Sequence, residues 1–500
     1  MNAPSFAFPS ADHIAAAKQE LAASADHLFI DGEFVAASDG ATLDVENPAS
    51  GEHLAQVASA GVADVDAAVR AAHRALHDGP WATMPATERA ALLWRLADAI
   101  EADAHDFALI ETLDNGMPYA QALMAAVPMA VDALRYNSGW ATKLGGETLP
   151  SGAPGEWFSY TLRQPVGVVA AIAAWNFPLS MACGKLAPAL AAGCTIVLKP
   201  AEQAPLSAVR LARIVQQVGF PKGVINILPG LGSVAGQALV DHPLVRKITF
   251  TGSTAVGKAI LRASANDLKR VTLELGGKSP AVVFGDADLG PAIEAAAMGV
   301  FFNTGQICVA RSRLFVEETV YDEVVEGVAG FIRNLKVGDG LEPGSMLGPV
   351  ISRAQLERIE SYISGGAAPA AGGRRIGDRG YFIEPTLFTG LDPDSPLARE
   401  EIFGPVVVAV PFKRGDLDAV ASAANDTSYG LAASIFTRDL STAHRLARRI
   451  DAGLIEINGG APMQFSLPFG GFKQSGLGRE NGREGVEAFT ELKSVSIRLA

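Results

Sequence analysis

The middle of the chain alternates short apolar runs with longer stretches of helical periodicity, and Gly, Pro or Asn separates one from the next. Apolar runs without polar alternation are typical of strands that are buried on both faces of a parallel sheet. Five such strands are expected, at Val166–Ala174, Thr195–Leu198, Val224–Leu228, Lys247–Phe250 and Val271–Leu275. The helices expected between them are Met181–Ala192, Leu206–Val218, Ser233–Val240 and Thr254–Ser264. This succession predicts an α/β fold with a doubly wound parallel sheet, which binds ligands at the carboxyl ends of its strands.

The same alternation starts again after Gly276 and Gly277 and predicts a second α/β unit. Its expected elements are a strand at Ala281–Phe284, a helix at Leu289–Phe302, a strand at Leu314–Val316 and a helix at Tyr321–Leu335. Upstream of the first sheet, the Ala-rich stretches Val62–Leu76 and Thr87–Leu113 each predict an amphipathic helix. Hairpin-like segments at Leu28–Phe34 and Thr42–Asn47 precede them. These upstream elements are expected to complete the first unit.

Two further segments, Glu147–Gln164 and Lys493–Leu499, alternate in the manner of strands but fit neither unit. Apolar side chains at Val495, Ile497 and Leu499 share one face of the second segment. An unpaired strand of this kind is a sticky edge, because its backbone N–H and C=O groups have no partner. We therefore expect the terminal strand to pair across a subunit interface.

The composition is that of a folded globular protein, with 500 residues of which 49% are hydrophobic and 19% are charged. This length favours two or three packed units. The net charge of −13 disfavours nucleic acid and anionic membranes as partners, so an anionic ligand needs a local pocket. The N-terminus has no basic region before an apolar core and carries Asp12, which disfavours an export signal.

One uncharged stretch, from Pro165 to Gly184, is about as long as a membrane span. Asn176 and Pro178 interrupt it, however, so it is better explained as a strand, a loop and a helix. Three cysteines, Cys183, Cys194 and Cys308, fit neither a disulfide framework nor a CxxC metal site. No metal is expected, and a reducing, cytoplasmic location is favoured.

Polar residues follow the first two strands of the predicted sheet, where a ligand would lie. Trp175-Asn176-Phe177-Pro178 is either a turn in which Asn176 tolerates an unusual backbone angle or a loop facing the ligand. Lys199 and Glu202 follow the second strand. A lysine there can hold ribose hydroxyls, and the carboxylate can accept hydrogen bonds from a diol while repelling a 2′-phosphate. A solvated surface pair is the alternative.

Two glycine-containing segments follow later strands. Phe250–Gly257 matches neither G-x-G-x-x-G nor a P-loop, but small residues at its helix start let a pyrophosphate approach backbone N–H groups. A tight contact between helix and strand explains the same glycines. Glu274 ends the last strand before Gly276 and Gly277, where desolvation would raise its pKa and make it a general base. A hinge between the two units is compatible with that role.

Cys308 follows a polar turn that contains Asn303, Thr304 and Gly305. Most free cysteines are inert core residues, yet a thiol after such a turn is a candidate nucleophile. No histidine lies near Cys308 in the sequence, which disfavours a Cys–His hydrolase.

Together these segments resemble the NAD(P)-dependent aldehyde dehydrogenase superfamily, from about Leu28 to Leu499. The matching motifs include WNFP, ELGGKSP and GQIC, then EIFGP at Glu401–Pro405 and PFGGFKQSG at Pro468–Gly476. The resemblance implies a Rossmann-like NAD-binding domain (1–145 and 165–275), a catalytic domain (276–475) and a small β oligomerisation domain (146–164 and 476–500). It also implies a homodimer or homotetramer.

The resemblance further implies that Cys308 is the nucleophile, Glu274 the general base and Asn176 the oxyanion donor. An aldehyde would be oxidised with NAD through a cysteine thiohemiacetal and a thioester, which water activated by Glu274 hydrolyses to the acid. The residues implied to hold the cofactor are Trp175, Lys199, Glu202, Gly252, Ser253, Gly257, Leu275, Glu401 and Phe403.

Two alternatives within the resemblance are less compatible with the sequence. Acylating relatives, which pass the acyl group to coenzyme A, generally lack the carboxylate at the place of Glu274. A non-catalytic member would have lost the thiol, the amide or the base, and this chain keeps all three. Glu202 favours NAD, with NADP possible.

The expected substrate pocket is apolar and contains Phe177, Met181, Gly184, Phe302, Met463 and Phe469. This lining favours an apolar aldehyde, either aromatic or of medium to long chain. Gly184 stands where many relatives carry a bulky aromatic residue, so the tunnel is expected to be wide unless a neighbouring side chain fills the gap.

Overall fold

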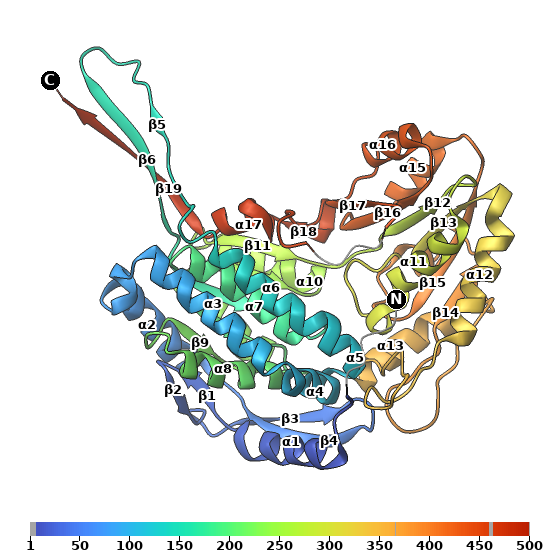
Figure 1. The fold of residues 1–500 in the computed structure, drawn as a ribbon, viewed down its shortest axis with the longest axis horizontal. Helices are drawn as coiled ribbons and strands as arrows, with labels where there is room; N and C mark the ends of the chain where they lie inside the picture. The colour runs from blue at the N-terminus through green and yellow to red at the C-terminus, as the bar shows by residue number, and fades with distance from the viewer. Residues whose placement is uncertain (1–6, 366, 460–463, 500) are drawn as a thin grey trace.

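The computed structural model describes residues 7–365, 367–459 and 464–499. Within these residues the strands form sheets of eight, six, three and two strands. The two large sheets lie in separate bodies, and the three-stranded sheet projects from the first body as a long arm (Figure 1). The predicted α/β class with a doubly wound parallel sheet is confirmed.

The centre of the eight-stranded sheet is parallel and buried. Its five parallel strands are β7 (Val168–Ile172), β8 (Thr195–Lys199), β9 (Ile225–Ile227), β10 (Val245–Thr251) and β11 (Arg270–Glu274). Every residue of β7, β8 and β9 is buried, which explains their non-alternating apolar sequences. The antiparallel edge strands are β1 (Leu28–Ile30) and β2 (Glu33–Val35) beside β9, and β18 (Gly476–Leu477) beside β11.

Helices cover both faces of this sheet. Val169 and Ala171 of β7 pack into one apolar core, while Val168 and Ala170 pack into the other. The helices of this body are α2 (Val62–His77), α3 (Ala86–Ala102), α4 (Ala104–Asn115), α5 (Tyr119–Gln121), α6 (Val127–Ser138), α7 (Pro178–Ala191), α8 (Leu206–Val218), α9 (Gln237–Asp241) and α10 (Thr254–Ser264). Shorter turns are η1 (Pro80–Thr83), η2 (Ala122–Ala126) and η3 (Gly232–Gly236), and β3 (Thr42–Asn47) pairs with β4 (Glu52–Ala58).

The six-stranded sheet is parallel throughout. Its strands are β12 (Pro280–Val283), β13 (Arg313–Glu317), β14 (Thr386–Thr389), β15 (Val406–Phe412), β16 (Ala432–Phe436) and β17 (Leu454–Ile457). Its helices and turns are α11 (Leu289–Phe301), η4 (Phe302–Gly305), η5 (Glu318–Val320), α12 (Tyr321–Asn334), α13 (Arg353–Ser364), α14 (Pro396–Arg399), α15 (Leu417–Asn425), α16 (Leu440–Ala447) and η6 (Lys473–Ser475). The carboxyl end of β11 leads directly to the amino end of β12, and the link between them joins the two bodies.

The arm consists of β5 (Thr148–Leu149), β6 (Trp157–Pro165) and β19 (Thr490–Arg498). One edge of the terminal strand is paired within its own chain, so the pairing expected across a subunit interface concerns the other edge and stays a prediction. Strand β19 pairs antiparallel with β6 of the same chain, from Thr490 opposite Pro165 to Arg498 opposite Trp157. The arm thus joins two strands, β6 and β19, that lie far apart in the sequence.

Two expectations need correction. The single helix expected at Thr87–Leu113 is two helices, because the chain turns at Asp103, whose carboxylate Oδ1 accepts a hydrogen bond from Arg210 Nη2 at 2.6 Å. The bridging segment expected at 476–500 begins later, since Leu477 of β18 lies opposite Leu273 in the first sheet. Helix α17 (Gly482–Glu487) contacts α7 of the same body.

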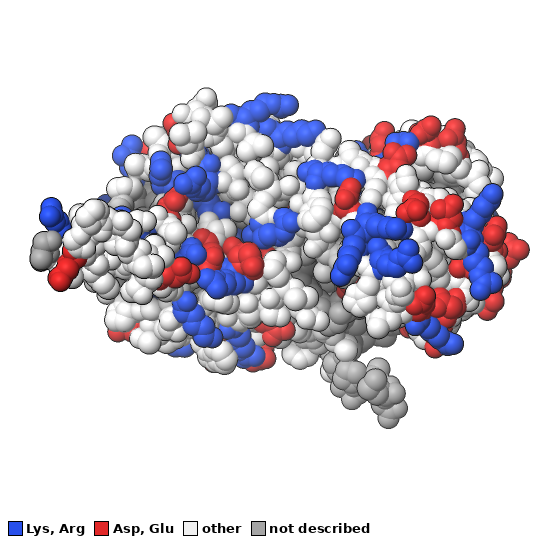
Figure 2. Space-filling model, turned by 90° about the horizontal axis from the view of Figure 1, so that it is seen from above, with Lys and Arg blue, Asp and Glu red and all other residues white. Residues whose placement is uncertain are grey.

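Surface charges of both signs are mixed. On the face seen in Figure 2, Lys and Arg side chains lie interspersed with Asp and Glu. A protein that binds a nucleic acid backbone usually gathers positive charge on one face. In the part of the chain that the structure describes, no helix is long and apolar enough to cross a membrane.

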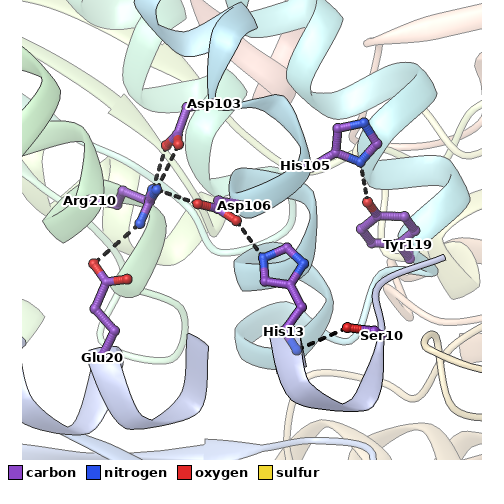
Figure 3. A network of polar contacts seen from close by, with 8 residues as sticks. All are labelled: Ser10, His13, Glu20, Asp103, His105, Asp106, Tyr119 and Arg210. Atoms are coloured by element: carbon purple, nitrogen blue, oxygen red, sulfur yellow. Dashed lines mark hydrogen bonds and ion pairs between the residues drawn. The ribbon is translucent and has the colours of Figure 1, made fainter. Parts of the chain in front are cut away.

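The N-terminal helix α1 (Ala11–Ser24) is fastened to the first body by ion pairs (Figure 3). His13 Nε2 lies 2.7 Å from Asp106 Oδ1 on α4. Arg210 on α8 contacts Asp106 and Asp103, and its Nη1 lies 3.3 Å from Glu20 of α1. The described residues ahead of Leu28 thus pack against the helices that cover the first sheet.

Candidate active site

The turn before Cys308 has an unusual backbone. Asn303, Thr304 and Gly305 follow one another with φ angles of 47°, 56° and 72°. Left-handed conformations in non-glycine residues cost about 1–3 kcal/mol each and persist only where surrounding contacts hold them. Here Thr304 Oγ1 donates to Gly348 O at 3.0 Å, and Gln306 Oε1 accepts from Ile351 N at 2.9 Å. The turn therefore presents Cys308 in a fixed position, half-buried, whereas Cys183 and Cys194 are buried.

Asn176 lies directly beside this turn. Its Nδ2 donates to Gln306 O at 2.8 Å, and Asn303 Nδ2 donates to Asn176 O at 2.8 Å. Asn115 Nδ2 holds the preceding residue through Trp175 O at 2.6 Å. Side-chain amides from α4 and η4 thus fix the segment that carries Asn176, whose own amide points to the backbone before Cys308.

Glu274 lies at the carboxyl end of β11 and is 3% exposed. Neither of its carboxylate oxygens has a hydrogen-bond partner among the described residues. Burial raises the pKa of Glu274 well above its usual value; the negative charge of Glu480 adds to the rise, and Lys185 and Arg479 oppose it. A carboxyl group in this state holds its proton to higher pH than an exposed glutamate and is a stronger base once ionised.

The thiol of Cys308 faces negative charge. Burial raises its pKa to about 12, and the carboxylates of Glu274 and Glu401 contribute, while the N–H groups of Val309 and Cys308 lower it. The ELGGKSP segment also touches this turn, since a Cβ on Gly277 would lie 2.3 Å from Cys308 O. The structure therefore brings Cys308, Glu274 and Asn176 together from three separate parts of the sequence.

Lys199 and Glu202 form a pair at the end of β8. Lys199 Nζ donates to Pro200 O at 2.7 Å, Gly230 O at 2.8 Å and Glu202 Oε2 at 3.1 Å. Because Lys199 is 2% exposed, the alternative of a solvated surface pair is wrong. The Glu202 carboxylate is partly exposed, and a Cβ on Gly232 would lie 3.8 Å from its Oε1. Because Gly232 has no side chain, a ligand bound to this carboxylate could also contact the Gly232 backbone.

The start of α10 lies close against the end of β11. Gly252 N donates to Glu274 O at 3.0 Å, and the Ser253 side chain caps the helix by accepting from Val256 N at 3.3 Å. A Cβ on Gly257 would lie 2.5 Å from Leu275 Cδ2. The close packing of helix α10 against this strand end therefore explains why residue 257 is a glycine. The first residues of α10 follow the carboxyl end of β10, and Lys199 lies at the carboxyl end of β8 in the same sheet.

Glu401 and Phe403 lie on the loop before β15. Glu401 Oε1 accepts from Gly277 N at 2.9 Å, and burial raises the pKa of Glu401 to about 7. Phe403 has a φ of 59°, and its ring meets that of Trp175 edge to face at 5.2 Å. This contact joins the loop of the second body to the WNFP segment of the first.

The expected pocket residues are found in different settings. Phe177 and Phe302 stack with ring centroids 6.4 Å apart, and Met181 and Phe469 are half-buried. A Cβ on Gly184 would meet nothing within 4 Å, so no neighbouring described side chain fills that space. Met463 lies outside the described residues.

The chain matches a known family along nearly its whole length. The family model described as "Aldehyde dehydrogenase family" matches residues 34–495. The chain belongs to the aldehyde dehydrogenase family. It is 48% identical over 476 residues to "Putative aldehyde dehydrogenase DhaS" of Bacillus subtilis (strain 168), covering 94% of this chain and 95% of that protein.

Solved structures agree with the family. The NAD+ complex of an aldehyde dehydrogenase from Bacillus cereus has a TM-score of 0.95 at 44% identity, covering 99% of this chain and 100% of the other. A mutant of the P. syringae AldA indole-3-acetaldehyde dehydrogenase, in complex with NAD+ and IAA, has a TM-score of 0.94 at 40% identity, covering 98% and 99%. This aldehyde dehydrogenase is therefore an NAD-dependent enzyme that oxidises aldehydes to acids.

Sequence reasoning missed several residues of the aldehyde dehydrogenase site. Asn115 precedes Gly116 and has the appearance of a helix end, so its bond to Trp175 O was invisible. Ser475 lies inside the PFGGFKQSG motif, yet nothing in that motif reveals that its Oγ donates to Gly276 O at 2.7 Å. Lys185 and Glu480, which flank Glu274 electrostatically, stand alone in the sequence and carry no local signal.

Proposed function

We propose that Cys308 attacks the aldehyde carbon and that Asn176 and Glu274 serve the two halves of the reaction. The observation that carries this proposal is the convergence of the three side chains between β11 and the turn before Cys308. The thiolate sulfur forms a bond to the carbonyl carbon, and the carbonyl oxygen becomes an oxyanion. The Asn176 amide and the Cys308 N–H are the donors proposed for it, and one such donor is typically worth about 3–4 kcal/mol.

Bound NAD supplies the acceptor for the hydride that leaves the thiohemiacetal carbon. The residues that support its binding are Lys199 and Glu202 for a ribose diol, the α10 start for the pyrophosphate, and Glu401 and Phe403 for the nicotinamide end. Exposed apolar side chains of Val234 on η3 and Val256 on α10 offer surface to a flat ring.

Glu274 is proposed to finish the reaction. Its carboxylate removes a proton from water, the resulting hydroxide attacks the thioester carbon, and the bond to Cys308 Sγ breaks to release the acid. Burial among few polar partners gives Glu274 the raised pKa that such a base requires. The presence of a buried carboxyl group here favours hydrolysis over transfer to coenzyme A.

An aldehyde panel tests this function directly. Reduced-nicotinamide absorbance is followed with wild-type enzyme, NAD or NADP, and aldehydes from acetaldehyde to phenylacetaldehyde and long-chain members. Turnover without coenzyme A supports the hydrolytic dehydrogenase, and turnover only with coenzyme A would identify an acylating enzyme. Bound NAD with no turnover on any aldehyde would favour a non-catalytic member.

Glu202 is proposed to favour NAD over NADP. Its carboxylate is held by Lys199 beside the backbone of Gly232, where a 2′-phosphate would meet a second negative charge. Replacing Glu202 with alanine should narrow the NAD preference in kcat/KM by about tenfold, the equivalent of about 1.4 kcal/mol. Equal kcat/KM for the two coenzymes in wild type would refute this role.

The substrate is proposed to be an apolar aldehyde with an aryl group or a long chain. The Phe177–Phe302 stack and the open space at Gly184 support this choice. Gly184→Trp should lower kcat/KM for phenylacetaldehyde and long-chain aldehydes by about a hundredfold while sparing acetaldehyde. A uniform loss across the panel, or no change, would refute the wide tunnel.

A homodimer or homotetramer is proposed from the arm. Phe158, Tyr160 and Leu162 on β6 lie on the same face as Val495 and Ile497 on β19, and Phe158 and Ile497 are 45% and 41% exposed. A second copy of this chain would bury that apolar face. Light scattering at micromolar concentration should give at least twice the 52.0 kDa chain mass, and a monomer would contradict the proposal.

A reducing, cytoplasmic location is proposed because the three cysteines form no disulfide bond.

A further inference from the structure

Arg311 is a buried arginine three residues after the proposed nucleophile, and it is 8% exposed. Its Nη1 donates to Val309 O at 2.8 Å, and its Nε donates to Ser434 Oγ at 3.0 Å. Its Nη2 forms an ion pair with Glu456. Each nitrogen of the guanidinium therefore has a separate partner.

These partners come from different elements around the Cys308 turn. Ser434 lies on β16 and Glu456 on β17. The backbone N–H of Arg311 donates to Gly299 O of α11 at 3.0 Å. A Cβ on Gly299 would lie 3.6 Å from Arg311 Cδ, so the side-chain stem packs along α11. A planar guanidinium bound at three points keeps one orientation. Arg311 thus fixes the Val309 carbonyl relative to the second sheet.

The charge of Arg311 opposes the other charges that face the Cys308 thiol. Glu274 from β11 and Glu401 from the loop before β15 both raise the Cys308 pKa. The guanidinium lies beside the thiol in the chain, because its Nη1 is bonded to the carbonyl of Val309, the residue after Cys308. Burial lowers the pKa of Arg311, and the negative charges of Glu456 and of a Cys308 thiolate oppose that fall. Arginine stays protonated even when buried, so its positive charge is permanent. A buried ion pair such as Arg311–Glu456 adds little net stability to a fold. Arg311 therefore matters to this site mainly through its positive charge and its hydrogen bond to Val309 O.

We propose that Arg311 is a positioning residue that fixes the turn behind Cys308 and stabilises the Cys308 thiolate by its charge, with Glu456 holding the guanidinium in place. This inference deepens the proposed function and rests on Cys308 being the nucleophile. It assigns no contact between Arg311 and the substrate.

The test is the pH dependence of Cys308 alkylation by iodoacetamide in the full chain without NAD. Mass spectrometry of the Cys308 peptide gives the rate separately from the buried Cys183 and Cys194. Arg311→Met is expected to lower the alkylation rate by about tenfold at pH 8 and by a similar factor at every pH between 7 and 10, because a smaller fraction of the thiol is ionised. Arg311→Lys, which keeps the charge but not the fork, should give an intermediate rate.

The double variant Arg311→Met/Glu456→Met separates positioning from folding. Removing both members of a buried pair avoids an unpaired charge, so its thermal midpoint should stay near that of wild type. Its alkylation should nevertheless remain as slow as that of Arg311→Met. A wild-type alkylation profile in the double variant would overturn the inference, because Arg311 would then serve the fold alone.

Arg210→Met is the matched control, since Arg210 also binds several carboxylates but lies on α8 in the first body (Figure 3). Its Cys308 alkylation should equal that of wild type, and a slower rate would overturn the specific role of Arg311. Failure of the proposed function appears differently: wild-type Cys308 would be alkylated without loss of NADH formation.

Discussion

Alanine in place of Cys308 is expected to abolish NADH formation, with a fall of at least about 10⁴-fold in kcat. Cys308 Sγ is the atom proposed to bond the aldehyde carbon, and neither Cys183 nor Cys194 can replace it because both are buried. Without that bond no thiohemiacetal forms, and the aldehyde hydrogen has no route to NAD. Absorbance at the reduced-nicotinamide band over the aldehyde panel measures the loss.

Cys194→Ala is the control for this substitution. Cys194 is fully buried directly before β8, and its Sγ donates to Phe489 O at 3.3 Å, so its loss should leave most of the activity. Thermal melting and NAD binding should be unchanged in Cys308→Ala. Substantial NADH formation by a folded Cys308→Ala enzyme would refute the nucleophile.

Glutamine in place of Glu274 is expected to slow steady-state turnover by about 10²–10⁴-fold while leaving the first turnover largely intact. The amide fills the space of the carboxyl group but cannot take a proton from water. Acylation of Cys308 does not need that proton transfer, so one equivalent of NADH should form in a burst before the reaction stalls. Stopped-flow absorbance resolves the burst from the slow phase.

The pH profile distinguishes this role from a structural one. Burial raises the Glu274 pKa, so the group is protonated and inactive as a base at low pH and becomes active as pH rises through that raised pKa. The wild-type steady-state rate should therefore rise with pH, with a midpoint above the usual carboxyl range. Glu274→Gln should lose this limb. A variant with no burst, or with the limb intact, would contradict the assignment.

Much of the fold could be predicted because the buried strands carry their signal locally. Uninterrupted apolar runs at β7 and β8 are explained by burial on both faces. The break at Asp103 could not be predicted, since the helical pattern at Thr87–Leu113 runs across it and the contact of Asp103 with Arg210 comes from a distant helix. The same holds for β19, whose register is set by β6 across more than half of the chain.

The candidate site divides in the same way. The three proposed catalytic residues could be recognised as candidates from their positions, since each lies at or just after the end of a strand or after a polar turn; they are Cys308, Glu274 and Asn176. The family motifs then suggested their roles. Asn115 and Arg311 could not be found, because a helix end and a charge before a strand are ordinary features of any α/β protein. Their significance depends on contacts with Trp175 O and Glu456, which only the folded chain creates.

The projecting arm also has a practical consequence for anyone who produces this enzyme. Strand β19 ends at Arg498, at the free end of the arm (Figure 1). An affinity tag fused to the C-terminus would sit beside the apolar face that includes Phe158 and Ile497, which is the surface proposed to join subunits. The assembly state is therefore best measured on protein from which any C-terminal tag has been removed.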